Sequence, residues 1–362
     1  MWWPTKVTFA VKSIVYRGIG LMCGTSQDGL DVADVRFTHD QNGNWTFDLL
    51  HGTTIPLPAN IKSSLTRARE MTGEELSHLH VQFGKWSGQV VRAFLQEHQS
   101  KATFVASHGV TVFHQPHRGF TTQIGSGAAI ATESGLPVIC DFRQSDVSKG
   151  GAGAPLVPSC DRFLFSDYDA TLNLGGFANF SVLGDDLRGF DIGPCNLLLN
   201  HLIAEKGLAF DDQGQLASTG QIIPSMLDTL SALDYYQGQP ASLGAEWFTL
   251  EVVAILERFS DHPLTDRLRT STEHIAQQIA RHTRSGQRIL FTGGGAFNSH
   301  LIERTRALSE AVFEIPDESL IDMKEAICFT FLGIRRLLEV SNIYSSSTGA
   351  WGDSSGGAVY LP

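Results

Sequence analysis

Alternating apolar and polar positions predict strands near the start of the chain. An apolar run at residues 14–22 ends at the polar segment CGTSQDG, and alternation resumes over residues 30–37. Two extended segments joined in this way predict a β-hairpin with a wide polar turn. A further extended run follows at residues 45–55.

Apolar residues at helical spacing predict a long helix over residues 73–99. Short buried strands are predicted at residues 103–107 and 136–142. The second of these strands ends in Arg143 and leads into SDVSKGGAGAPLVP, whose glycines and prolines predict a loop and a candidate domain boundary.

The strand and glycine-turn pattern recurs in the second half of the chain. A strand at 170–174, the turn GGFANF and strands at 181–183 and 187–191 lead into the helical segment PCNLLLNHLIAEK. The remaining predicted elements are helices over 224–233, 245–259 and 264–282, a strand at 288–292, the turn GGG, a helix from Asn298, a strand at 312–315 and a helix over 323–339. This alternation predicts an α/β fold, and the two glycine hairpins predict a duplicated fold with a site between the copies.

Composition and charge narrow the class of ligand. The 362 residues, 42% hydrophobic and 18% charged, are enough for two globular domains. Acidic residues outnumber basic ones by 38 to 27, a formal charge of −11 without a basic run, which argues against binding of nucleic acid or of an anionic membrane. An anionic ligand would have to be bound by local groups such as backbone N–H groups, helix N-termini, single arginines or a metal ion.

The five cysteines are widely spaced and form no C-x-x-C pair, so a reducing compartment fits best. The first residues lack the long apolar core of a signal peptide, and no stretch approaches the length of a membrane span. We therefore expect a soluble, cytoplasmic protein.

Three glycine turns are candidate phosphate sites. The first, at the hairpin turn, comprises Gly24, Thr25, Ser26, Gln27, Asp28 and Gly29. Its N–H groups and hydroxyls could surround phosphate oxygens, and Asp28 could bind Mg²⁺ through water; the alternative is an ordinary hairpin turn. The others are Gly175 and Gly176 after a strand, and Gly293, Gly294 and Gly295 between a strand and a helix. Neither the dinucleotide fingerprint G-x-G-x-x-G nor a P-loop is present.

Asp191 ends a strand in GFDIGPCN, where its carboxylate could accept a proton. The alternative is that it caps the helix that follows Pro194. Arg143 could form a bidentate pair with a carboxylate ligand, or a structural salt bridge. His108 is more often a structural residue than an acid–base group, and Glu325, at the expected start of the last helix, suits the helix dipole.

The segments together are similar to a known family. They are GLMCGTSQDGLDVADVRF, ASHGVTVFHQP, TTQIGSGAAIATESGLPVICDFRQSDVSKGGAGAPLVP, LNLGGFANFSVL, GFDIGPCNLLLN, FTGGGAFNSHL, EAICFTFLGI and STGAWGDSSGGAVY. This ordered series resembles the anhydro-N-acetylmuramic acid kinases of the actin, hexokinase and sugar-kinase superfamily, from about Gly18 to the C-terminus.

The resemblance implies two RNase H-like domains around a central cleft, with ATP as phosphoryl donor, Mg²⁺ and a homodimer. Enzymes of that family hydrolyse the 1,6-anhydro ring of the sugar and phosphorylate O6 during cell-wall recycling. Carried to this sequence, the loop from Gly24 to Asp31, including Leu30, would hold ATP phosphates together with the other two glycine turns. Asp191 would activate water, and Arg143, Glu325 and Thr111 would lie on the sugar side.

The expected domain division assigns residues 1–143 and 345–362 to one lobe and residues 144–344 to the other. Several residues depart from the family pattern: Cys23, Gln27, Val110, Ala152 and the pair Gln144-Ser145. These differences leave open a kinase for another anhydro sugar such as levoglucosan, or a non-catalytic nucleotide-sensing relative.

Overall fold

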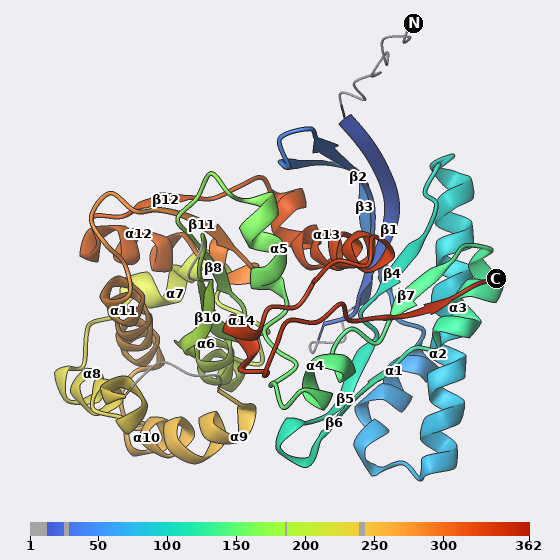
Figure 1. The fold of residues 1–362 in the computed structure, drawn as a ribbon. Helices are drawn as coiled ribbons and strands as arrows, with labels where there is room; N and C mark the ends of the chain where they lie inside the picture. The colour runs from blue at the N-terminus through green and yellow to red at the C-terminus, as the bar shows by residue number, and fades with distance from the viewer. Residues whose placement is uncertain (1–12, 25–28, 185–186, 239–242) are drawn as a thin grey trace, which may run out of the picture. The chain divides into compact units, whose positions relative to one another are not determined.

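The computed structural model describes residues 13–24, 29–184, 187–238 and 243–362. The chain forms two compact units, a first unit of Met1–Leu164 with Glu325–Pro362 and a second unit of Phe165–Lys324. Both are α/β, as predicted (Figure 1).

The unit boundaries lie at residues 164 and 324 rather than at the expected 143 and 344. Helix α5 (Val157–Leu164) belongs to the first unit because Cys160 Sγ donates to the carbonyl of Cys328 at 3.2 Å. The later part of helix α13 (Glu318–Leu337) packs on β1 (Ser13–Met22), where a Cβ at Gly20 would lie 2.0 Å from the Ala326 carbonyl oxygen. These contacts carry the C-terminal part of α13 into the first unit.

The first unit is built on a mixed sheet with the strand order β13-β7-β4-β1-β2-β3. The strands besides β1 are β2 (Gly29–Asp40), β3 (Trp45–Pro56), β4 (Val105–Ser107), β7 (Val138–Cys140) and β13 (Ala358–Tyr360). Strands β1, β2 and β3 are antiparallel, whereas β4 pairs parallel with both β1 and β7. The predicted hairpin of the first two strands is confirmed.

Helices and a small hairpin complete the first unit. The helices are α1 (Ala59–Thr66), α2 (Gly73–Glu97), α3 (Gly127–Ser134), α4 (Gln144–Ser148), α5 and α14 (Ser345–Thr348). Helix α2 begins at a capping box in which Glu75 N donates to Thr72 Oγ1 and Thr72 N donates to Glu75 Oε2. The hairpin of β5 (Val110–Gln115) and β6 (Phe120–Ile124) was not predicted; its turn includes Gly119, whose φ is +80°.

The second unit repeats the strand order of the first. Its sheet is ordered β10-β9-β8-β11-β12, with β8 (Ala170–Leu174), β9 (Phe177–Val182), β10 (Arg188–Pro194), β11 (Arg288–Thr292) and β12 (Val312–Glu314). Three antiparallel strands again lead to two parallel ones beside the first strand. The predicted duplication into two RNase H-like units is therefore confirmed.

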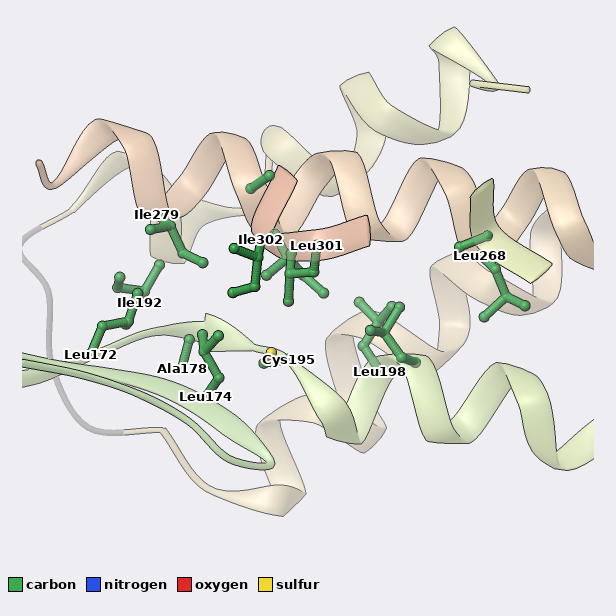
Figure 2. Close-up of a cluster of buried hydrophobic side chains, with 14 of the residues drawn as sticks. Leu172, Leu174, Ala178, Ile192, Cys195, Leu198, Leu268, Ile279, Leu301 and Ile302 are labelled. Carbon is green, nitrogen blue, oxygen red and sulfur yellow. The ribbon is translucent and has the colours of Figure 1, made fainter. Parts of the chain in front are cut away.

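Helices enclose the core of the second unit. They are α6 (Asn196–Ile203), α7 (Gln215–Thr219), α8 (Pro224–Ser231), α9 (Ala245–Trp247), α10 (Val253–Arg258), α11 (Leu264–Arg281) and α12 (Ser299–Leu308), with a π-helical segment (Phe248–Val252) joining α9 to α10. Figure 2 shows Leu172 and Ile192 of the sheet packed with Ile279 of α11 and Leu301 of α12. Burying such a side chain contributes about 1.5–3 kcal/mol to stability.

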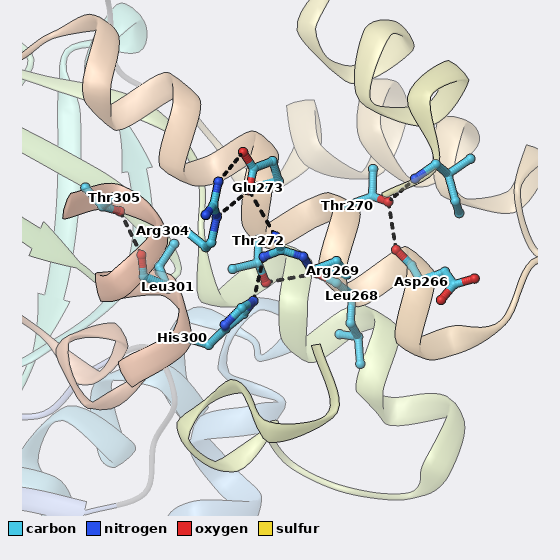
Figure 3. Close-up of polar contacts among 11 residues, drawn as sticks. Asp266, Leu268, Arg269, Thr270, Thr272, Glu273, His300, Leu301, Arg304 and Thr305 are labelled. Carbon is cyan, nitrogen blue, oxygen red and sulfur yellow. Dashed lines mark hydrogen bonds and ion pairs between the residues drawn. The ribbon is translucent and has the colours of Figure 1, made fainter. Parts of the chain in front are cut away.

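A buried ion-pair network joins α11 to α12 (Figure 3). Arg304 donates to both carboxylate oxygens of Glu273 at 2.7 and 3.1 Å, and Arg269 lies 3.7 Å from the same carboxylate. Arg269 also hydrogen-bonds His300 Nε2 at 2.7 Å. Because Glu273 is only 4% exposed, its charge depends on these partners, and α12 is held in place behind the third glycine turn.

Two predicted elements begin four or five residues before their expected starts. Strand β9 begins at Phe177, because only Gly175 and Gly176 form the turn, whereas the sequence placed the strand at 181–183. Helix α13 begins at Glu318, so the prediction that Glu325 starts this helix is wrong. Within the described residues no helix is long and apolar enough to cross a membrane.

Candidate functional site

The first glycine hairpin is described only at its two ends. Gly24 follows β1 and Gly29 begins β2, while the predicted phosphate-loop residues Thr25, Ser26, Gln27 and Asp28 lie outside the described residues. Leu30 is buried in the core, so it can offer a ligand only its backbone. Asp31 lies on β2 and accepts a hydrogen bond from Thr54 Oγ1 at 2.6 Å.

The second glycine turn lies between β8 and β9 against the start of α6. Cys195 N donates to the Gly176 carbonyl at 2.8 Å and Asn196 N to the Gly175 carbonyl at 3.1 Å. Neither glycine has a positive φ, and the nearest described atoms to an added Cβ lie 3.5 Å away at Gly175 and 3.9 Å away at Gly176. Backbone strain and packing therefore do not require glycine here, whereas the close approach of a phosphate would.

The third glycine turn, Gly293–Gly295, packs directly on the end of β8. Gly293 has a φ of +78°, and a Cβ there would lie 2.1 Å from Asn173 Oδ1. A Cβ at Gly295 would lie 2.7 Å from that of Leu174, whose carbonyl accepts from Asn196 Nδ2 at 3.0 Å. The second and third glycine turns of the sequence thus lie together, joined through β8 and the start of α6.

A cavity of about 550 Å³ opens beside the third turn. Its lining combines apolar, amide and acidic side chains with turn backbone: Asn196, Leu199, Asn200, Phe210, Asp211, Asp212, Gln213, Gly294, Gly295, Phe297 and Asn298. A cavity of this size, with apolar walls and a few polar groups, could hold a nucleoside.

Asp191 lies on β10 directly opposite Asn179 of β9, and a β-bulge follows it. Its side chain is a buried acceptor: Asn179 Nδ2 donates to Oδ1, and the backbone N–H of Leu243 donates to Oδ2 at 2.6 Å. Burial raises the pKa of Asp191 to about 6, although the Leu243 N–H lowers it. The capping alternative is wrong, because the N-cap of α6 is Cys195.

Arg143 is partly buried at the start of α4 and is held by uncharged acceptors. Nη1 donates to the Gly153 carbonyl at 2.7 Å, and Nε and Nη2 lie 3.1 and 2.9 Å from His108 Nε2. Burial lowers the pKa of Arg143 to about 10, and the charge of Glu325 raises it. Glu325 therefore lies within electrostatic reach of Arg143.

His108 has the structural role that the sequence favoured. Its Nδ1 lies 2.9 Å from the Gly109 carbonyl, which can only accept, so Nδ1 carries the proton and Nε2 is free to accept from Arg143. Burial and the nearby Arg143 lower the pKa of His108 to about 3. This histidine is a neutral acceptor that orients the guanidinium.

Thr111 lies on β5 beside Gln123 of β6. Gln123 Nε2 donates to Thr111 Oγ1 at 3.2 Å and to Thr121 Oγ1 at 2.8 Å. Thr121 N in turn donates to Gln144 Oε1 at 3.2 Å, which ties this hairpin to the residue after Arg143. Gln123 Oε1 is buried and has no hydrogen-bond partner among the described residues.

Three features escaped the sequence analysis. Asn179 stands within the segment GGFANF, but only its glycines were given a role; the polar residue at an alternating position was the available signal. Gln123 was missed because the hairpin of β5 and β6 was not predicted. The acidic residues of the cavity, Asp211 and Asp212, belong to no recognisable sequence motif. Among the described residues no group of three or more His, Cys, Asp or Glu side chains could hold a metal ion.

The comparisons with known proteins agree with each other. A family model described as anhydro-N-acetylmuramic acid kinase matches residues 16–362. A protein of that name from Pseudomonas paraeruginosa (strain DSM 24068 / PA7) is 33% identical over 374 residues, covering 96% of this chain and 99% of the relative. Another, from Vibrio cholerae serotype O1, is 34% identical over 368 residues, covering 95% and 98%.

A solved structure of the activator of the 2-hydroxyisocaproyl-CoA dehydratase from Clostridium difficile with bound ADPNP aligns with a TM-score of 0.39 at 13% identity. The alignment covers 90% of this chain and 99% of the other. This similarity is too distant to support a conclusion about the site.

Proposed function

The chain belongs to the anhydro-N-acetylmuramic acid kinase family, and from this premise we propose that it is an ATP-dependent kinase of 1,6-anhydro-N-acetylmuramic acid. It hydrolyses the 1,6-anhydro ring and phosphorylates O6, giving N-acetylmuramic acid 6-phosphate and ADP. The observation that carries the proposal is Asp191, a buried carboxylate with a pKa of about 6 on the sheet that also carries two glycine turns.

Asp191 acts as general base in the proposed reaction. Its carboxylate takes a proton from water as the water oxygen bonds to C1 of the sugar. The C1–O6 bond breaks, and O6 attacks the γ-phosphorus of ATP as the bond to the ADP oxygen breaks. A raised pKa suits this task, because a carboxylate of pKa about 6 is ionised at neutral pH and is a stronger base than an ordinary aspartate.

The nucleotide is assigned to the glycine turns and the neighbouring cavity. The nucleoside occupies the cavity at Gly294 and Gly295, and Gly175 and Gly176 offer backbone to the phosphates. The loop from Gly24 to Asp31 is proposed to contact phosphate as well. Mg²⁺, held chiefly by the ATP phosphates, would neutralise charge on the transferring group.

The sugar is assigned to Arg143, Glu325 and Thr111. The partly buried guanidinium of Arg143 keeps N–H groups beyond those used by His108 and Gly153, and these can pair with the lactyl carboxylate of the sugar. The ionised carboxylate of Glu325 can accept a hydrogen bond from a sugar hydroxyl. A single positioned arginine thus attracts the carboxylate locally in a chain whose net charge is −11.

A sugar panel tests the proposal. Purified protein is incubated with ATP, Mg²⁺ and either 1,6-anhydro-N-acetylmuramic acid or levoglucosan, with ADP and 6-phosphorylated reducing sugar measured together. We expect equal amounts of both products from the first sugar and little from the second. Preference for levoglucosan would identify a different substrate, and a folded protein without turnover on either would refute the kinase activity. The homodimer and the cytoplasmic location remain predictions.

A further inference from the structure

Three polar side chains form a row across the sheet of the second unit. In register, Asn173 of β8 lies opposite Asn179 of β9, and Asn179 lies opposite Asp191 of β10. Directly paired residues in antiparallel strands point to the same face, so these side chains are neighbours. The row runs from the residue that packs against Gly293 to the proposed base.

Among the described residues, Asn179 and Leu243 are the donors to the Asp191 carboxylate. Asn179 Nδ2 donates to Oδ1, while Oδ2 receives the Leu243 N–H from a separate segment. The two carboxylate oxygens together offer about four lone-pair directions, so one donor on each oxygen fixes the plane of the group and leaves directions in which a water can donate. The strand pairing and the bulge after Asp191 fix the position from which Asn179 donates.

We propose that Asn179 is a positioning residue for the base, orienting the Asp191 carboxylate toward the attacking water and keeping it ionised. The inference rests on the proposed function. A neutral amide suits this role: a lysine or arginine at the position would stabilise the carboxylate so strongly that it became a weak base, and an apolar residue would leave Oδ1 without a donor. The amide favours the ionised form by a hydrogen bond while adding no net charge.

Other ionisable groups near Asp191 do not replace Asn179. Tyr235, Tyr236, Arg281 and His282 line a cavity of about 220 Å³ that Asp191 also borders. The Tyr235 hydroxyl donates to the backbone carbonyl of Asp191 rather than to its carboxylate, and burial raises the pKa of Tyr236. Burial and the neighbouring Arg281 lower the pKa of His282.

The test compares Asn179→Leu, similar in size but without a donor, with Asn179→Ser, which keeps a shorter donor. Ser181→Ala is the matched control, because Ser181 lies on the same strand and face but is paired with Gly189. We expect Asn179→Leu to lower kcat about 10–100-fold at pH 7.5 and to move the acid limb of the rate profile upward by about one pH unit, with KM for ATP unchanged. Asn179→Ser should be intermediate, and Ser181→Ala should match the wild type.

A second measurement does not depend on turnover. The ¹³C carboxyl resonance of Asp191, assigned by its loss in Asp191→Asn, is titrated in wild type, Asn179→Leu and Asn179→Ser. A higher midpoint in the variants supports the proposal, and unchanged midpoints together with an unchanged acid limb overturn it. If the wild type shows no turnover on anhydro sugars, the proposed function fails, while the titration still decides whether Asn179 controls the protonation of Asp191.

Discussion

Asp191 in the second unit and Arg143 in the first are held in opposite ways. Asp191 is a buried carboxylate that receives one donor on each oxygen, and burial raises its pKa to about 6. Arg143 is a partly buried guanidinium whose N–H groups meet a neutral histidine and a backbone carbonyl, and burial lowers its pKa to about 10. Burial thus favours the neutral form of both groups.

The two groups nevertheless differ in what they can do at neutral pH. The pKa of Asp191 lies close to the working pH, so this group can gain and lose a proton during a reaction cycle. The pKa of Arg143 stays well above that range, so its charge is permanent and can only attract or orient a ligand. Loss of contact with water therefore leaves a proton acceptor in one place and a fixed charge in the other.

The largest expected effect comes from removing the acceptor. Asp191→Asn should lower kcat by about 10²–10⁴-fold, because an amide cannot take a proton from water. The affinity for ATP, measured by calorimetry, should change less than about twofold. Asp228→Asn, an exposed substitution on α8, is the control and should retain full activity. Normal turnover by Asp191→Asn would refute the role of this residue as base.

Replacing Arg143 should have a smaller effect, limited to the kinetics toward the sugar. Arg143→Lys keeps the charge but loses the planar set of donors that meets His108 and Gly153. We expect kcat/KM for the anhydro sugar to fall about 10–100-fold, with KM for ATP little changed. Arg118→Lys, at an exposed site, is the control. An equal loss toward a sugar without a carboxylate would contradict pairing with the lactyl group.

The pH dependence of kcat should show the titration of a single group, Asp191. Protonation of Asp191 removes the base, so kcat should be half-maximal near pH 6 and fall about tenfold for each further pH unit. His108, with a pKa of about 3, and Arg143, with a pKa of about 10, should add no step between pH 5 and 8. Rates are measured after each pH jump and again on return to pH 7.5, so that unfolding is recognised. A second step in this range would show that one of these assignments is wrong.

The smallest effect is on stability, and its sign follows from the raised pKa. Between about pH 4 and pH 6 the folded protein binds more protons at Asp191 than the unfolded chain does, so stability is lost as pH rises. The shift from 3.8 to about 6 corresponds to a maximum of about 3 kcal/mol. The amide NH₂ of an asparagine at this position would face a donor of Asn179 or Leu243, and two donors cannot hydrogen-bond each other. We therefore expect Asp191→Asn to raise the free energy of unfolding by only about 1–2 kcal/mol at pH 8.

Urea unfolding of wild type and Asp191→Asn at pH 4 and pH 8 measures this difference. The variant should be more stable than the wild type at pH 8 and about 1 kcal/mol less stable at pH 4, where the protonated Asp191 of the wild type no longer carries the cost of a buried charge. A variant that is less stable at both values would indicate that the carboxylate is stabilised by its donors more than it is penalised by burial.

The sequence predicted most elements with a strong local pattern. Helix α11 and strand β11 lie where periodicity placed them, and the two glycine hairpins revealed the duplicated order of strands. The start of α13 was missed because the apolar residues of 318–322 do not show clear helical spacing. Strands β5 and β6 were missed; they pair with each other in a separate two-stranded sheet.

Side-chain partners could not be obtained in the same way. Asp191 was identified as a candidate base, but its donors come from β9 and from Leu243, which is distant in sequence. His108 and Arg143 are likewise brought together by folding, and their hydrogen bonds decide the tautomer of the ring. Pairings of this kind depend on strand register and loop path, which local sequence does not determine.

The course of the chain through its two units has a consequence for synthesis on the ribosome. The second unit is continuous from Phe165 to Lys324, whereas the first contains β13 and the later part of α13, which are translated last. The second unit can therefore fold as soon as it emerges, while the edge of β7 waits for its partner strand. Until β13 is made, the edge of β7 is unpaired and can bind chaperones or aggregate. Truncation after Lys324 should therefore destabilise the first unit, at the N-terminal end of the chain, more than the second unit, which ends at Lys324.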